Sequence, residues 1–358
     1  EVCKPELGYV AEPLDLPGVE QPECEFVGLD VAVDRVFDDL HSSVKVLCRR
    51  EIKVWRMITF LSAGPGSLAL INGSRQILHD SEIAVVASTA MDSRISGNHS
   101  APDIDAAIFL FAGILDTSRW WGIRGDTFTT HNYLPKVAGG EPLPIGDRAR
   151  AVEIARTDLL RRGLTLTEAV QAQCRALSIG ATILPATDTR AGVLVDTGTE
   201  RLPLFEYWAG TITDTEVREL IPATATPPAV TDAVRATIEA SDAVIIGPDN
   251  PARGILSILD CTGMRDLLRD QFVVAVSPFS GDVAPDPKDA ALMYAIGERP
   301  TSHGVFRLYE DIVDVFVQDL HDPDEVGGSL RLETHLLHDR QAESLAWDIM
   351  AVIRHAVS

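Results

Sequence analysis

The run Met57-Ile-Thr-Phe-Leu-Ser-Ala-Gly-Pro-Gly-Ser67 decides the fold of this 358-residue chain. A compact β-prone segment is followed at once by a loop with two glycines, Gly64 and Gly66, and then by residues 68–78, which suit a helix. Strand, glycine loop and helix in this order are typical of α/β proteins that bind phosphate, because backbone N–H groups at a helix start face the anion. Pro65 removes one such N–H group, so a plain structural turn is an equally good interpretation of the loop.

Alternating strands and helices on the C-terminal side predict a parallel sheet. Residues 230–278 read as helix, strand, tight loop at 247–251, helix and strand, and this rhythm is typical of βαβ units. Residues 149–178 hold two helical patterns and no strand pattern, which predicts a helical insertion. Further strands are expected at 83–88, 182–184, 192–197, 204–208, 304–308 and 313–317, and further helices at 290–296 and 345–357. The prediction is an α/β fold with a mostly parallel sheet and helices on both faces.

The charge balance excludes one large class of partner. The chain has 53 acidic and 31 basic residues, and its net charge of −22 repels the phosphates of nucleic acids. No nucleic-acid partner is therefore expected. A lysine-poor acidic composition is compatible with a protein that works at high salt concentration and with an ordinary acidic cytosolic protein.

Cysteine usage and the first residues predict a cytoplasmic protein. The five cysteines show no CxxC spacing, which argues against a disulfide scaffold or a zinc site. The opening residues lack the basic-then-apolar pattern of a signal peptide, and the apolar segment 106–115 is too short to span a bilayer, so no membrane partner is expected. Residues 1–56 differ from the rest in composition and hydrophobic pattern. They are predicted to be an N-terminal extension with an amphipathic helix at 31–47.

Carboxylates and a tryptophan pair flank the apolar segment 106–115, which reads as a buried helix. The flanking stretches are Ser100-Ala-Pro-Asp-Ile-Asp105 and Trp120-Trp-Gly-Ile-Arg-Gly-Asp-Thr-Phe128. Asp103 and Asp105 suit the first turn of that helix, where acidic side chains interact favourably with the helix dipole. Residues two apart face different ways on a helix, so a cation bound by both requires a non-helical backbone through Asp103.

Several stretches, taken together and in order, resemble the 2-phospho-L-lactate transferases, the CofD family of coenzyme F420 biosynthesis. They are residues 58–66, 100–105, 120–128, 146–148 with 156–157, 166–169, 207–208, 247–251, 273–278 and 314–319. The resemblance covers most of residues 57–358 and leaves residues 1–56 without a counterpart. It implies a Rossmann-like α/β domain with a helical insertion near 149–178, and it suggests a homodimer.

The resemblance also implies a reaction. The terminal ribityl hydroxyl of the deazaflavin precursor FO would attack the lactyl-bearing phosphorus of a guanosine-diphospho-lactate donor, or of its enolpyruvyl analogue, and release GMP. In such an in-line substitution a protein contributes mainly positioning and charge neutralisation. The resemblance implies Mg²⁺, and a divalent ion held by carboxylates would supply positive charge that an acidic chain lacks.

Residue roles follow from the same resemblance. Asp105 corresponds to the deazaflavin-binding aspartate and is expected to orient or deprotonate the attacking hydroxyl. Asp103 is its catalytic companion near the phosphates, and both are expected metal ligands. The expected nucleotide-binding residues are Ser62, Gly64, Gly66, Gly247, Asn250 and Pro251. The further expected substrate-binding residues are Asp92, which follows the strand at 83–88, and Trp120, Asp126, Asp147 and Arg148.

Several positions depart from the family pattern and keep alternatives open. Ala63-Gly-Pro-Gly66 stands where the family usually reads Gly-Gly-Thr-Gly, and Ala69 stands where a lysine is common. Ser88 replaces an asparagine, and Pro144 replaces a basic residue of the deazaflavin site. The alternatives are an inactive homologue that binds nucleotide or deazaflavin, and a nucleotide-sugar-binding regulator of the gluconeogenesis-factor type.

Overall fold

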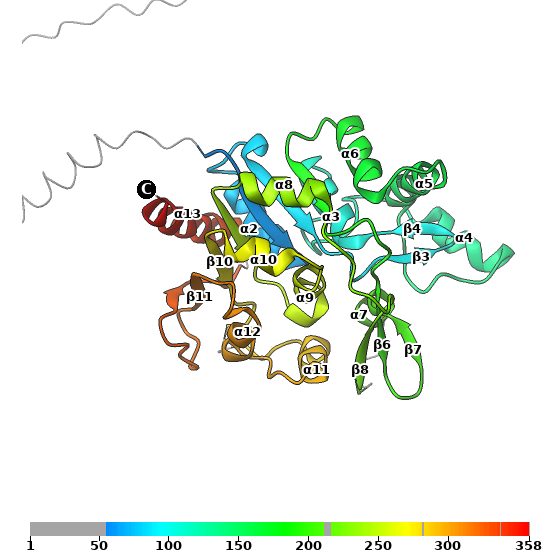
Figure 1. Cartoon of the computed structure of the whole chain (residues 1–358). Coiled ribbons are helices and arrows are strands. Elements are labelled where there is room, and N and C mark those ends of the chain that lie inside the picture. The colour runs from blue at the N-terminus through cyan, green and yellow to red at the C-terminus, as the bar shows by residue number, and fades with distance from the viewer. Residues whose placement is uncertain (1–54, 211–215, 281–282, 337, 358) are drawn as a thin grey trace, which may run out of the picture. The chain divides into compact units, whose positions relative to one another are not determined.

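A computed structural model describes residues 55–210, 216–280, 283–336 and 338–357 of the chain (Figure 1). The helix predicted at 31–47, and all but two residues of the predicted extension, lie outside these described residues.

A seven-stranded sheet forms the centre of the fold. Its strand order is β12 (Leu330–Leu332), β11 (Val315–Asp319), β10 (Val273–Val276), β9 (Ala243–Ile246), β1 (Ile58–Ser62), β2 (Ile83–Ala87) and β5 (Thr182–Pro185). Each neighbouring pair is parallel. All residues of β1, β2, β9 and β10 are buried, which explains why these strands are continuous apolar runs rather than alternating ones. The predicted α/β class with a mostly parallel sheet is confirmed.

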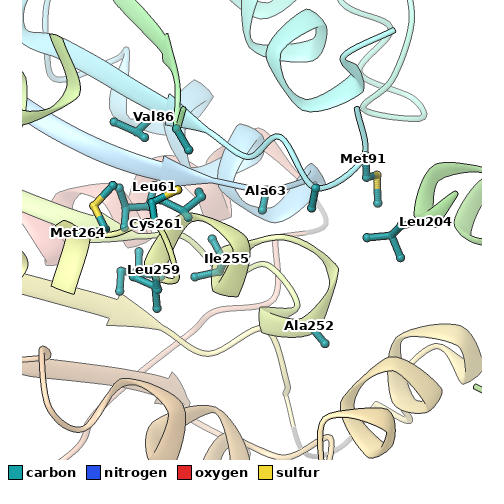
Figure 2. Close-up of a cluster of buried hydrophobic side chains, with 14 of the residues drawn as sticks. Leu61, Ala63, Val86, Met91, Leu204, Ala252, Ile255, Leu259, Cys261 and Met264 are labelled. Atoms are coloured by element: carbon teal, nitrogen blue, oxygen red, sulfur yellow. The ribbon is translucent and has the colours of Figure 1, made fainter. Parts of the chain in front are cut away.

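Alternate side chains of the strands enter two separate cores. On one face, Phe60 and Val85 pack with α2 (Pro65–Ser74), α3 (Pro102–Phe111), α6 (Leu166–Ala176) and α13 (Asp339–Ala356). On the other face, Leu61 and Val86 pack with α8 (Asp232–Ala240), α9 (Ile255–Leu259), α10 (Met264–Arg269), α11 (Pro287–Ala295) and α12 (Ser302–Tyr309). Figure 2 shows Leu61 and Val86 in this second core, with Ile255 and Leu259 below them. Helices therefore cover both faces of the sheet.

Smaller elements surround the sheet. Strands β3 (Ser93–Ile95) and β4 (Asn98–Ser100) form an antiparallel hairpin. Strands β7 (Arg201–Pro203), β6 (Val193–Asp196) and β8 (Glu219–Pro222) form an antiparallel sheet of their own (Figure 1). The remaining elements are α4 (Thr129–Val137), α5 (Asp147–Arg161), α7 (Leu204–Ala209) and the short 3₁₀ helices η1 (Asp80–Glu82) and η2 (Pro251–Arg253).

The predicted helical insertion is confirmed as helices α5 and α6. The Thr165 hydroxyl caps α6 by accepting the N–H of Glu168 at 3.1 Å, and the N–H of Thr165 donates to the Glu168 carboxylate at 2.8 Å. The buried apolar helix predicted at 106–115 forms earlier, as α3, and all ten of its residues are buried. Over the described part of the chain, no helix is long and apolar enough to cross a membrane.

Two strand predictions are wrong. Residues 204–208 form helix α7, and residues 304–308 lie within helix α12. Both are short apolar runs, for which period alone does not separate strand from helix. In α12 the Thr301 hydroxyl accepts the N–H of Gly304 at 3.2 Å. This cap at the helix start favours a helix over a strand for residues 304–308.

The strand order creates one place where a ligand site is expected. From β1 the chain crosses over to β2 on one side, whereas from β9 it crosses over to β10 on the other side. In open parallel sheets, ligands bind in the crevice outside the carboxyl ends of two such strands. Two segments, called here the β1 and β9 loops, both leave the sheet at this point: residues 62–66, which run from the end of β1 into the first turn of α2, and residues 247–251, which run from β9 to the start of η2.

Candidate functional site

One carboxylate, that of Asp249, locks together the loops that follow β1 and β9. Its Oδ2 accepts a hydrogen bond from the backbone N–H of Ala63 at 2.9 Å, and its Oδ1 accepts from the N–H of Gly66 at 3.0 Å. The N–H of Ser67 donates to the same Oδ1 at 3.2 Å, and the Ser67 hydroxyl donates to Oδ2. Asp249 therefore supplies the anion at the N-terminus of α2, where the sequence pattern predicts a phosphate.

The glycines of these loops make the close approach possible. A Cβ on Gly66 would overlap the carbonyl oxygen of Pro248, and a Cβ on Gly64 would overlap the guanidinium of Arg253. A Cβ on Gly247 would overlap helix α2. The space that the glycines leave is thus filled by protein atoms, in line with the structural-turn interpretation. Nucleotide binding by the two loops stays a prediction.

The other residues predicted to bind nucleotide are buried against the same loops. Asn250 donates through Nδ2 to the carbonyl of Asp289 at 2.9 Å and accepts the N–H of Ala252 at 2.9 Å, so its amide is already used within the protein. Pro251 begins η2 and is buried. Ser62 is also buried, and its hydroxyl has no hydrogen-bond partner.

A pocket beside these loops, the Arg253 pocket, contains a cation next to an acid with a free oxygen. It is lined by Gly64, Pro65, Pro102, Asp103, Ala106, Trp120, Trp121, Trp208 and Arg253, among others. The Arg253 guanidinium lies 5.5 Å from the centroid of the Trp208 ring, and its ion pairs are long, at 3.6 Å to Asp249 and 3.7 Å to Asp289. Its Nε is buried without a partner. An arginine held in this way is suited to bind a phosphate.

Asp103 faces this pocket from the first turn of α3. It is 7% exposed, and its Oδ2 has no hydrogen-bond partner. Burial raises the pKa of Asp103 from 3.8 to about 8, with Arg253 opposing the rise and the nearby Asp249 and Asp92 adding to it. A buried carboxylate among other acids is stable in its charged form only beside a cation.

Asp105 lies in different surroundings from Asp103, although only two residues separate them. Its two oxygens accept from Arg156, with Nη1 to Oδ1 at 2.6 Å and Nη2 to Oδ2 at 2.8 Å. Helix α3 includes both aspartates, so the non-helical backbone that a shared cation requires is not found. The geometry favours Asp103 alone at the cation position, with Asp105 held by the arginine.

A second pocket, the aromatic pocket, lies on the other side of the first turn of α3. Its lining includes Ser100, Asp105, Phe109, Phe128, Pro144, Glu153 and Phe205. The two pockets share Pro102, Ala106 and Trp121, so they adjoin along this turn. In the aromatic pocket, Trp121 and Phe205 meet edge to face, with ring centroids 6.0 Å apart. The chemistry of this lining suits a flat apolar ring, although the free space of about 30 Å³ is too small to admit one without widening.

Asp126 and Asp147, both predicted to bind substrate, cap the starts of two neighbouring helices. Asp126 accepts the N–H groups of Arg148 and Ala149, each at 3.0 Å, at the start of α5. Asp147 accepts the N–H groups of Thr129 and Thr130, each at 2.9 Å, at the start of α4. A hydroxyl hydrogen bond from Thr127, together with these N–H groups, lowers the pKa of Asp147 below its usual value. These carboxylates are largely used for capping.

Of the remaining predicted substrate residues, one lines a pocket, whereas Asp92 and Arg148 line neither of the two. Trp120 lines the Arg253 pocket and adopts a positive φ of 54°. Asp92 follows β2, as predicted, and its Oδ2 lies 3.2 Å from Nε2 of His99. Burial raises the pKa of Asp92, although His99 opposes the rise. The Arg148 guanidinium is half-exposed and donates to the carbonyl of Arg124 at 2.6 Å.

A larger cavity of about 420 Å³ opens between α9 and the sheet of β6, β7 and β8. Its lining is mostly apolar and includes Ala90, Leu220, Ala252, Ser257 and Asp260. Ala90 follows β2 and Ala252 follows β9, so this cavity also lies at the carboxyl ends of the central strands.

Comparison with known proteins identifies the family. A family model described as 2-phospho-L-lactate transferase CofD matches residues 58–348. The chain belongs to the CofD family. The family membership that the sequence motifs predict is therefore confirmed, and the matched residues include every pocket described above.

Individual relatives cover the same part of the chain. The 2-phospho-L-lactate transferase of Methanocorpusculum labreanum is 44% identical over 299 residues, which are 82% of this chain and 98% of that protein. The protein of the same name from Methanospirillum hungatei is 40% identical, with 82% and 99% coverage. A solved structure of a UPF0052 family member from Bacillus halodurans has a TM-score of 0.51 at 11% identity, covering 83% of this chain and 99% of that one. This last likeness concerns the fold alone.

A CofD metal site would have to be completed by the substrate. Among the described residues, no group of three or more histidine, cysteine or acidic side chains is arranged to hold a metal ion. Mg²⁺ is, however, commonly bound by one or two carboxylates together with substrate phosphates. The free Oδ2 of Asp103, beside an arginine suited to phosphate, fits that mode of binding.

Three important residues of this CofD chain are missing from the sequence prediction: Asp249, Arg253 and Glu153. Asp249 lies within the segment 247–251, of which only Gly247, Asn250 and Pro251 are predicted to bind nucleotide. Arg253 lies two residues beyond the end of that segment. Glu153 lies on a helix whose pattern gives no sign of a pocket. The available signal was an acid and an arginine four apart after a strand, a spacing that pairs side chains in helical turns.

Proposed function

We propose that this chain transfers a 2-phospho-L-lactate group, or its enolpyruvyl analogue, from a guanosine-diphospho donor to a hydroxyl of the deazaflavin FO in coenzyme F420 biosynthesis. GMP is the second product. The family membership supports the reaction class. One observation supports the choice of donor and acceptor: the aromatic pocket and the Arg253 pocket adjoin along the first turn of α3.

Each pocket suits one part of this reaction. The aromatic pocket would hold the deazaflavin ring, and the Arg253 pocket would hold the diphosphate next to the guanidinium. The attacking hydroxyl would then reach the phosphorus across Pro102 and Ala106, which line both pockets. Alignment of this kind is the main contribution that a protein makes to phosphoryl-type transfer.

Asp103 would hold Mg²⁺ in this arrangement. When bound, the ion would neutralise charge on the diphosphate. Asp103 would hold the ion by its free oxygen, whereas Asp105 would act as a positioning residue, because Arg156 occupies both of its oxygens. This assignment departs from the sequence-based one, in which Asp105 orients or deprotonates the hydroxyl.

The guanosine part of the donor would enter the larger cavity. About 420 Å³ is ample for a nucleoside, and the Asp260 carboxylate offers acceptors for the N–H groups on one edge of guanine. The proposal further includes a cytoplasmic, homodimeric enzyme, which the cysteine pattern and the family resemblance support.

One assay tests the proposal. The purified chain is incubated with FO, guanosine-diphospho-lactate and Mg²⁺ over a range of salt concentrations, and the deazaflavin product is followed by chromatography. The expected result is Mg²⁺-dependent conversion of FO together with release of GMP. Absence of product at every salt concentration would contradict the transfer function.

A second candidate function is favoured by one observation. Because Asp249 occupies the anion position at the N-terminus of α2, a homologue that binds its ligands without turnover is also compatible with this geometry. Binding of FO or GMP without product would support this second candidate.

A further inference from the structure

The aromatic pocket contains an acid, Glu153, to which neither the proposed reaction nor the sequence motifs assign a role. Glu153 projects from α5, is 3% exposed and lines the pocket beside Ser100 and Asp105. Its Oε2 is buried without a hydrogen-bond partner. Burial, with the nearby Asp105 adding to it, raises the pKa of Glu153 from 4.5 to about 7, although Ser100, Arg156 and Arg150 oppose the rise.

The neighbouring charged groups are already paired with other residues. Arg156 is bound to Asp105, and Arg150 is bound through both terminal nitrogens to Glu141, at 2.7 and 2.6 Å. Asp126, the other acid of the lining, accepts backbone N–H groups at the start of α5. Among the described acids of the pocket lining, Glu153 is therefore the one with a buried and unpartnered oxygen.

A buried polar atom without a partner is costly, so its retention inside an apolar pocket indicates a ligand that completes it. Among the described residues of the lining, Arg119 is the remaining charged side chain, and it donates to Asp116 at 2.9 Å and lies 5.8 Å from the centroid of the Trp121 ring. Pro144 in the wall adds no charged group. A deazaflavin ring carries a polar edge, an N–H group between two carbonyls, on a flat aromatic body.

We infer that Glu153 is a specificity-determining residue that hydrogen-bonds the polar edge of the planar acceptor ring in the aromatic pocket. This inference rests on the proposed function, because it takes FO as the acceptor. A carboxyl group at this position can accept from a ring N–H group when ionised and donate to a ring carbonyl when protonated.

The pocket must widen for the ring to enter. It has about 30 Å³ of free space, which is room for about one water molecule. The segment 119–128 forms one wall and contains Gly122 and Gly125 at positive φ. Outward movement of this segment would expose Oε2 of Glu153 to the ring.

The test compares four full-length proteins: wild type, Glu153→Gln, Glu153→Met and Asp158→Asn. FO binding is measured by fluorescence titration, GMP binding by calorimetry, and folding by thermal unfolding. Asp158 is a matched control, because it lies on the same helix and its side chain is 66% exposed. We expect Glu153→Met to weaken FO binding about tenfold or more, with GMP binding unchanged, and Glu153→Gln to have a smaller effect. Asp158→Asn should bind FO like the wild type.

A purely structural role for Glu153 makes a different prediction. It would lower the unfolding temperature of Glu153→Met and would not separate FO binding from GMP binding. Unchanged FO affinity in Glu153→Met would overturn the inference and leave the proposed function intact. A wild-type protein that binds no FO at all would overturn both.

Discussion

Arg156 holds both carboxylate oxygens of Asp105, at 2.6 and 2.8 Å, although the arginine is completely buried. The pair joins α5 of the insertion to α3 beneath the proposed active site. The same Arg156 also donates to the carbonyl of His99 at 3.0 Å. Asp105 is therefore part of the structural support of the site.

Asp105→Asn should destabilise the fold. Removing one partner of a buried ion pair leaves an uncompensated charge, which costs about 3–5 kcal/mol of the free energy of unfolding. Urea denaturation measures this loss. The double variant Asp105→Leu with Arg156→Met should recover much of it, because apolar residues of similar size often replace buried ion pairs without loss. Wild-type stability in Asp105→Asn would show that the pair is not formed in solution.

Asp103→Asn should abolish turnover while the fold stays intact. The Oδ2 of Asp103 has no partner in the protein, so the amide removes no hydrogen bond at that atom and keeps a polar group of similar size in the buried position. We expect turnover to fall by at least about a hundredfold, a scale common for the loss of a group that stabilises transition-state charge. The measurement is product formation against Mg²⁺ concentration, with urea denaturation as the control. Near-normal turnover with unchanged Mg²⁺ dependence would remove Asp103 from the mechanism.

Asp249→Asn tests the locking of the two loops. The amide loses charge-assisted hydrogen bonds from Ala63, Gly66 and Ser67, and each such bond contributes about 1.5–3 kcal/mol. We expect a fall in the free energy of unfolding of at least this size, measured by urea denaturation. Asp266→Asn, at a side chain that is 85% exposed, is the control and should unfold like the wild type. If both variants unfold alike, the loops are not held by Asp249.

Asp260→Asn tests the placement of the guanosine. The substitution replaces one acceptor with a donor facing the N–H edge of the base, so GMP affinity should fall about tenfold. Calorimetric titration with GMP measures this, and FO affinity should stay unchanged because the aromatic pocket has a different lining. Equal losses for both ligands would indicate a general effect on folding instead.

The central architecture could be predicted from the sequence because it depends on local patterns. Apolar runs such as residues 58–61 and 243–246 are buried on both sides, and their period and spacing alone predict parallel strands. Residues 204–208 and 304–308 could not be assigned in the same way. Their apolar runs fit either structure. A side-chain cap supports the helix at 304–308, whereas the helix at 204–208 has no such cap and buries Leu204, Phe205 and Tyr207.

The candidate site could be predicted only in outline. Asp103 and Asp105 are close in sequence, yet Asp105 is paired with Arg156 and Asp103 is influenced electrostatically by Arg253, and both arginines lie at least 51 residues away in the chain. Which oxygen is free depends on those distant arginines, so local sequence could not separate the two roles. The anion at α2 was likewise predicted to come from a ligand, whereas Asp249 supplies it from a loop 183 residues away.

Glu153→Gln should change how stability depends on pH. The pKa of Glu153 is raised to about 7 in the folded chain, above its usual value of 4.5, so the folded state binds more protons than the unfolded state between these values. Wild-type stability should therefore fall as the pH rises from about 4.5 to about 7, and the loss should level off above that range. Since glutamine does not titrate, Glu153→Gln should become more stable than the wild type by about 1–3 kcal/mol at pH 8. Urea denaturation of both proteins from pH 5 to 8 measures the difference, and parallel curves would show that folding does not raise the pKa of Glu153.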